Sequence, residues 1–170
     1  MKKVLSAAMA ALMCLSLLSG CTEAGGPAPD QDKKADLAAF VQTVQENHEF
    51  PALEKADPSD QDVGAVMLEN SYPGLKDMDL EQVEIHLALI SFTGGELSLV
   101  EAKNADDAAK VKEMFQDRVA SKSEEGPNNY PQEVETWQRS ARVADHGNYV
   151  MLVCNEDCDA IVDEFNALFQ

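Results

Sequence analysis

The residues that follow position 33 carry apolar side chains with the period of an α-helix. One expected helix face consists of Leu37, Phe40, Val41 and Val44. Their spacing of i, i+3, i+4 and i+7 predicts a helix over residues 34–48 that ends before Pro51. A second, short helix is expected to begin near Ser59, where the Ser-Asp-Gln-Asp run resembles a capping sequence. The apolar residues that this second helix would bury are Val63, Val66 and Met67.

Beyond Pro73 the apolar period changes to that of a β-strand. The alternating apolar residues are Val83, Ile85, Leu87 and Leu89. This period of two predicts a strand, and Gly94-Gly95 at the centre of residues 93–96 predicts a tight hairpin turn into a second strand over 97–103. Asn104 is then expected to cap a helix, because Asp side chains follow it in the first turn. The buried stripe of that helix consists of Ala108, Val111, Phe115 and Val119.

After a polar connection over residues 121–129, the C-terminal part of the chain repeats this order. A short strand over 142–145, a turn at His146-Gly147 and an apolar strand over 149–154 are followed by Asn155, which is expected to cap a terminal helix. The apolar residues of that helix are Cys158, Ile161, Val162, Phe165, Leu168 and Phe169. The repeat is that of a ββα unit used twice, by duplication or by convergence of hairpin and capping chemistry.

These patterns predict a single α+β domain over residues 33–170. Its sheet is expected to have about four, mostly antiparallel strands, which come from the two ββα units and carry packed helices. One or two N-terminal helices precede the sheet. The length suits one domain with a core of its own and is too short for two.

The order of features from about Tyr72 to Phe169 also resembles a known family. The residues that carry the resemblance are 79–83 (Asp-Leu-Glu-Gln-Val), 96–103 (Glu-Leu-Ser-Leu-Val-Glu-Ala-Lys), Tyr130-Pro131 and 147–150 (Gly-Asn-Tyr-Val). They resemble the bacterial lipoprotein family carrying domain of unknown function 4358. The resemblance implies a shared fold and implies no catalytic residue. Cys154 and Cys158 stand where it leads us to expect apolar side chains.

The first residues of the chain are typical of an export signal. Residues 1–3 are Met-Lys-Lys, and residues 4–18 contain no charge. They end in Leu18-Ser19-Gly20-Cys21, which resembles the lipobox of bacterial lipoproteins. We therefore expect a signal peptide over 1–20, lipid on the thiol of Cys21, and a flexible Gly- and Pro-containing tether that completes the segment 21–32. The alternative is an ordinary secretory signal.

The charge of the chain restricts its partners. The net charge is −18, and removal of Lys2 and Lys3 with the signal peptide makes it −20. Phosphate backbones repel such a surface, so nucleic acid binding is excluded as a function class. We favour the solvated surface of a soluble domain as the explanation of this charge, over a dedicated site for a cation or a basic protein partner. A basic protein or a small ligand beside the membrane remains the candidate partner.

The candidate chemistry of the mature chain is sparse. His48, His86 and His146 do not lie at metal-ligand spacing, and His86 is expected to be a half-exposed strand residue, so we predict no metal and no cofactor. Apart from Cys21, the mature thiols are Cys154 and Cys158, which close a strand and begin a helix. We expect them to form a disulfide or a buried thiol pair and not a reactive site.

Two classes of function remain open. The first is a non-catalytic binding or adaptor module, held by lipid at the outer face of the cell membrane. The second is an extracytoplasmic enzyme whose site is assembled from dispersed residues. We favour the first, because the sequence predicts no catalytic residue. A deep pocket with convergent titratable groups would favour the enzyme, and a flat apolar patch would favour the binding module.

Overall fold

The computed structural model describes residues 34–57, 59–60, 63–88, 94–126 and 129–170. The predicted signal peptide, Cys21 and the predicted tether lie outside these residues. Across the described ranges, no helix has both the length and the apolar character that a membrane span requires.

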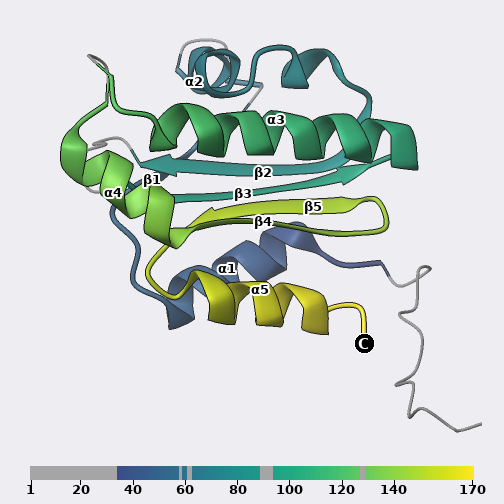
Figure 1. Ribbon diagram of the computed structural model, residues 1–170. Coiled ribbons are helices and arrows are strands. Elements are labelled where there is room, and N and C mark those ends of the chain that lie inside the picture. The colour runs from purple at the N-terminus through teal and green to yellow at the C-terminus, as the bar shows by residue number, and fades with distance from the viewer. Residues whose placement is uncertain (1–33, 58, 61–62, 89–93, 127–128) are drawn as a thin grey trace, which may run out of the picture.

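A five-stranded antiparallel sheet forms the centre of the domain (Figure 1). Its strands are β1 (Leu53–Lys55), β2 (Leu80–Ala88), β3 (Glu96–Ala102), β4 (Ala141–His146) and β5 (Tyr149–Cys154), in the spatial order β1-β2-β3-β5-β4. The predicted α+β class is confirmed, with one strand more than expected. The additional strand, β1, pairs with β2 over three residues, which is too short to show a period in the sequence.

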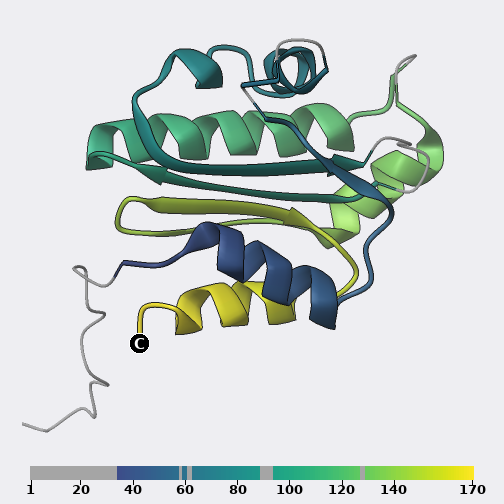
Figure 2. The ribbon, with the colours of Figure 1, turned by 180° about the vertical axis from the view of Figure 1, so that it is seen from behind.

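Helices cover both faces of the sheet (Figures 1 and 2). The helices are α1 (Leu37–Asn47), α2 (Gly64–Ser71), α3 (Ala105–Ser123), α4 (Pro131–Ser140) and α5 (Cys158–Ala167), with a short 3-10 helix, η1 (Leu75–Asp77). Helices α2 and α3 lie on one face, α1 and α5 lie together on the other, and α4 lies at one end of the sheet. The domain therefore has three layers.

Two apolar cores result, one on each face of the sheet. Strands β3 and β5 are buried at every residue, because both of their faces are covered. The core under α3 is built around Phe115, and the core under α1 and α5 is built around Phe165, which contacts Phe40 at a ring distance of 6.2 Å. The predicted burial of Phe115 and Phe165 is confirmed, since neither is exposed.

The second helix differs from its prediction. It begins at Gly64, where the carboxylate of Asp60 accepts a hydrogen bond from the Gly64 N–H at 3.2 Å. Val63 and Val66, which were expected to point inward, are 57% and 54% exposed, and Leu68 is the buried side chain of this helix. The predicted orientation is wrong for these two valines, because a run of so few apolar residues does not define one helix face, whereas Met67 is partly buried and packs against the core as expected.

Three further connections also differ from prediction. The turn is not centred on Gly94-Gly95 as expected, because Gly95 pairs with Ala88 of β2 and Glu96 already belongs to β3; Thr93 of the expected turn, and Leu89 of the expected strand, lie outside the described residues. Residues 131–140 form α4, which follows the predicted polar connection and which we did not expect, since its buried face includes the polar Glu133 and Ser140. Asn155 does not cap α5. Its side chain accepts a hydrogen bond from the Asp157 N–H at 2.8 Å, and Asp157 occupies the cap position.

Candidate functional site

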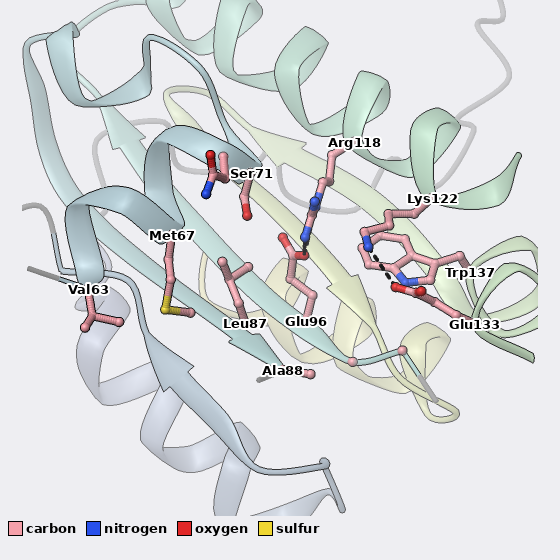
Figure 3. A pocket seen from close by; sticks show the side chains of 13 residues that line it. Val63, Met67, Ser71, Leu87, Ala88, Glu96, Arg118, Lys122, Glu133 and Trp137 are labelled. Atoms are coloured by element: carbon pink, nitrogen blue, oxygen red, sulfur yellow. Dashed lines mark hydrogen bonds and ion pairs between the residues drawn. The ribbon is translucent and has the colours of Figure 1, made fainter. Parts of the chain in front are cut away.

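A cavity of about 560 Å³ lies where β2 ends and β3 begins, between α2, α3 and α4 (Figure 3). One side of it is apolar and is formed by Val63, Met67, Leu87 and Ala88. The opposite side carries charged and polar groups on β3, α3 and α4, namely Glu96, Arg118, Lys122, Glu133 and Trp137. Pockets for small molecules in proteins combine these two kinds of wall.

Glu96 is the first residue of β3, and its carboxylate is 1% exposed. The alternation of the strand points it to the α3 side of the sheet, where Arg118 extends from α3. The Arg118 Nε and Nη2 atoms each donate a hydrogen bond to Glu96 Oε2 at 3.2 Å. A buried carboxylate needs such a partner, because burial removes its hydration.

The second oxygen of Glu96 is held by two hydroxyl groups. Ser98 Oγ donates to Glu96 Oε1 at 2.8 Å, and the hydroxyl of Tyr72 donates to the same oxygen. Burial and the charge of Glu96 raise the pKa of Tyr72 well above its ordinary value. Tyr72 is therefore a neutral donor at physiological pH, and Glu96 is saturated with hydrogen bonds.

Arg118 is also held by two aromatic rings. Its guanidinium carbon lies 5.8 Å from the centre of the Tyr72 ring and 5.7 Å from the centre of the Trp137 ring. Cation–π attraction at these distances adds to the ion pair with Glu96. The guanidinium is therefore held between Tyr72, which lies shortly before η1, and Trp137 of α4.

A second buried ion pair lies beside the first. Lys122, one helical turn after Arg118 on α3, donates from Nζ to Glu133 Oε1 at 2.8 Å, and Glu133 is 1% exposed. Glu133 and Trp137 are spaced i, i+4 and share a face of α4. In the part of the chain that the structure describes, two of their buried polar atoms have no hydrogen-bond partner: Glu133 Oε2 and Trp137 Nε1.

Comparison with known proteins assigns the chain to a family. A family model described as "Domain of unknown function (DUF4358)" matches residues 54–155. The chain belongs to the DUF4358 family. The match includes all residues that line the pocket, whereas α1 and α5 lie outside it. No curated protein and no solved structure matches the chain.

The residues that we singled out in this DUF4358 protein do not meet in the pocket. Cys21 lies outside the described residues. Cys154 and Cys158 are free thiols, 1% and 3% exposed, and they belong to the cores on opposite faces of the sheet. Burial raises the pKa of Cys154 to about 12 and also raises that of Cys158.

The three histidines lie in separate places. His48 bonds Asp157 and Glu164, His86 bonds Glu84 at 2.9 Å, and the ring of His146 stacks on that of Phe169. The side chain of His86 is 13% exposed, so it is more buried than the half-exposed residue we expected. Among the described residues, no group of His, Cys, Asp and Glu could hold a metal ion.

Sequence reasoning missed the pocket residues, although one signal was present. Arg118 and Lys122 are spaced i, i+4 on an amphipathic helix of a chain with only 13 basic residues against 31 acidic ones. Two basic residues that share a helix face next to the apolar stripe indicate buried carboxylate partners. The partners themselves, Glu96 and Glu133, could not be chosen from so many acids.

Proposed function

We propose that this protein is a non-catalytic binding module, anchored by lipid on Cys21 at the outer face of the cell membrane, which takes a small molecule into the pocket between α2, α3 and α4. The observation that carries the proposal is the pair of buried ion pairs, Glu96–Arg118 and Lys122–Glu133. They hold the polar wall rigidly beside an apolar wall. Such preorganisation favours binding, because little side-chain entropy is left to lose.

The place where the chain enters the domain supports an anchored module. The Ala35 N–H donates to the hydroxyl of Tyr149 at 3.2 Å, and the Leu37 N–H donates to Gln82 Oε1 at 3.0 Å. Gln82 lies near the start of β2, and the pocket lies at its end, about 20 Å away at roughly 3.4 Å per residue. A lipid attached before this entry point would leave the pocket at the end of the domain remote from the membrane.

The pocket favours a small ligand over the alternative of a basic protein partner. Its lining contains two basic and two acidic side chains, which sum to no net charge despite the acidity of the whole chain. A basic protein would be attracted by the outer surface and would gain nothing from Arg118 and Lys122. The charge balance within the pocket is therefore the more specific feature.

An enzyme is the second candidate, because titratable groups converge in the pocket. In an enzyme, Glu133 would be the candidate general base, through its Oε2 atom. However, Glu133 forms an ion pair with Lys122 at 2.8 Å, so its carboxylate already serves a structural contact between α3 and α4. This contact is the reason that we propose binding.

Trp137 provides the test, because it is the only tryptophan of the chain and lines the pocket. We expect a saturable change in its fluorescence when the purified chain is titrated with the small-molecule fraction of the growth medium. Met67→Lys, which places a charge on the apolar wall, should abolish the change. Val66→Lys, on the exposed side of the same helix, should not. An unchanged response in Met67→Lys, with an intact melting transition, would contradict the proposal.

Glu133→Gln separates the two candidate functions. A binding module should show no turnover of broad hydrolase and lyase substrates in either the parent or the variant. A turnover activity that is lost in Glu133→Gln and kept in Glu135→Gln, an exposed residue of the same helix, would establish the enzyme. Both variants remove one carboxylate from α4, so the comparison isolates the position within the pocket.

A further inference from the structure

The two ion pairs of the pocket differ in which partner a ligand can reach. The side chains of Arg118 and Lys122 are 17% and 19% exposed. Those of their partners, Glu96 and Glu133, are each 1% exposed. All four residues line the cavity (Figure 3). The accessible part of the polar wall is therefore positive, although the four charges together sum to zero.

The two cations also have hydrogen-bond donors that the protein does not use. A guanidinium and an ammonium group each carry several N–H donors. Arg118 donates to Glu96 from Nε and Nη2, whereas its Nη1 atom donates to none of the described residues. Nη1 is not one of the described buried polar atoms that lack a partner, so it is accessible to solvent. Lys122 Nζ donates one bond, to Glu133. Both cations can therefore donate to a ligand.

The two carboxylates of the pocket offer a ligand no comparable contact. Both oxygens of Glu96 already accept hydrogen bonds from protein groups. One oxygen of Glu133 accepts from Lys122, and the other is buried away from solvent. An ammonium group of a ligand would therefore find no acceptor on Glu96 or Glu133, whereas an anion would find donors on their partners.

The guanidinium of Arg118 is suited to a carboxylate. Its position between the rings of Tyr72 and Trp137 is fixed before a ligand arrives. Guanidinium donors match the geometry of carboxylate oxygens, and such charge-assisted hydrogen bonds are stronger than neutral ones. Because each cation is already paired with a carboxylate, a single negative charge is favoured over two. The acidic outer surface has little influence here, since salt at 0.1 M screens exposed charges over about 10 Å.

The opposite wall defines the body of the ligand. Met67 and Leu87 present apolar side chains to the cavity, and Val63 stands at its edge with 57% of its surface exposed (Figure 3). Covering these groups removes apolar surface from water, which favours association. The ligand should therefore be anionic at one end and apolar at the other.

We propose that the pocket binds a small monocarboxylate with an apolar body. The carboxylate accepts hydrogen bonds from Arg118 and Lys122, and the apolar body lies against Met67 and Val63. The chemical class is that of an organic acid with one carboxylate, such as a medium-chain fatty acid. This inference rests on the proposed function and names the ligand class of the same pocket.

The test is a titration of the full chain with four probes, followed by calorimetry and by the fluorescence of Trp137. Octanoate, octanamide and octylamine share one apolar chain and end in a negative, a neutral and a positive group. Acetate carries the carboxylate without the chain. We expect octanoate to bind about tenfold more tightly than octanamide, because its hydrogen bonds are charge-assisted. Octylamine and acetate should bind more weakly still.

Asn70 allows the sign of the charge to be tested at a site that is not buried. It is exposed, belongs to α2 and lines the cavity. Asn70→Asp should weaken octanoate binding about fivefold, and Asn70→Lys should strengthen it by a similar factor, because each places one charge beside the carboxylate. Val66→Asp adds the same charge at an exposed position of α2 that does not line the cavity, and it should leave the affinity unchanged.

A substitution in the polar wall tests the contact itself. Lys122→Gln removes one of the two cations and should weaken octanoate binding at least about tenfold. Lys110→Gln is the control, since Lys110 forms an exposed ion pair on the same helix and should not affect binding. Thermal melting shows whether Lys122→Gln is folded. If it is not, the two Asn70 variants decide the question.

Two outcomes would overturn the inference. The first is octanoate that does not bind, or that binds no more tightly than octanamide, octylamine or acetate. The second is octanoate binding that neither Asn70→Asp nor folded Lys122→Gln weakens, which would place the carboxylate elsewhere. A persisting response to the growth-medium fraction would then reject the ligand class alone. If that response is absent as well, the proposed function fails, so the two failures are distinguishable.

Discussion

At the scale of single residues, His48 joins the N-terminal helix to the C-terminal one. It lies at the end of α1, and its Nδ1 and Nε2 atoms lie 3.0 Å from Asp157 Oδ2 and 3.1 Å from Glu164 Oε1. The hydrogen bond with Asp157 is the main cause of a raised pKa; burial opposes it and Glu164 adds to it. A protonated ring can donate to both carboxylates, so the charged form is the one that ties the helices together.

The raised pKa of His48 predicts that stability depends on pH. The folded protein holds this proton more tightly than the unfolded chain does, so the stabilisation is complete below the ordinary pKa of 6.5 and is lost as the pH rises through the higher, folded value. We expect the urea concentration at the midpoint of unfolding to decrease as the pH is raised from about 6 to about 8. In His48→Gln this part of the pH dependence should disappear, and an identical pH profile in that variant would contradict the assignment.

The two thiols of the domain provide a second prediction at this scale. Cys154 and Cys158 are buried, and burial raises the pKa of both, so little thiolate is available for reaction. We expect iodoacetamide to modify them slowly in the native protein and rapidly in urea. Fast alkylation of both native thiols would be inconsistent with the buried positions. A mass lighter by a pair of hydrogens would show that they are bonded.

At the scale of elements, the Lys122–Glu133 ion pair connects α3 to α4. Lys122→Met should destabilise the fold by about 3–5 kcal/mol, because it leaves the buried carboxylate of Glu133 without its cation. Adding Glu133→Leu should recover most of this loss, since the charge is then gone as well. Urea unfolding of the single and double variants measures both effects.

A matched control is available on the same helix. Lys110 also lies 2.8 Å from a carboxylate, that of Asp107, but its side chain is 63% exposed. Lys110→Met should therefore change the free energy of unfolding by less than about 1 kcal/mol. If Lys122→Met has no greater effect than Lys110→Met, the buried ion pair does not hold α4 in place.

The elements also show why some helices were predictable and α4 was not. Helices α1 and α3 each repeat apolar residues at helical spacing over several turns, and Asn104 caps α3 as predicted by accepting from the Asp107 N–H at 2.9 Å. Helix α4 has few apolar residues and buries Glu133 instead. The sequence around Glu133 does not distinguish a buried acidic residue from a solvated one, because its partner, Lys122, belongs to another helix.

At the scale of the whole molecule, the lipid anchor is the prediction with the widest consequence. Cys21→Ser should abolish the incorporation of radiolabelled fatty acid and the recovery of the protein with the membrane fraction, because the thiol is the expected site of acylation. Cys14→Ser, within the predicted signal peptide, should leave both unchanged. Label in the Cys21→Ser protein would place the acylation elsewhere, and a parent protein without label would show that the signal is an ordinary secretory one.

The sequence alone determined the features that depend on neighbouring residues. The periods of apolar residues and the Asn104 cap led to the α+β class and to the two ββα units, because each is set within a few residues along the chain. Only the tertiary structure decided where those units lie. Helices α3 and α5 follow equivalent hairpins, yet they cover opposite faces of the sheet. An apolar stripe indicates that a helix packs against the sheet, but it does not determine which face of the sheet the helix covers.

The pocket likewise belongs to the tertiary structure. Glu96 is separated from Arg118 by 22 positions, and the sheet and α3 bring them together. Lys122 of α3 contacts Glu133 of α4, and the sequence pattern does not reveal α4. In a chain with 31 acidic residues, composition cannot indicate which carboxylates lose their water. That choice is made by packing, because the burial of a charge depends on all the elements that surround it.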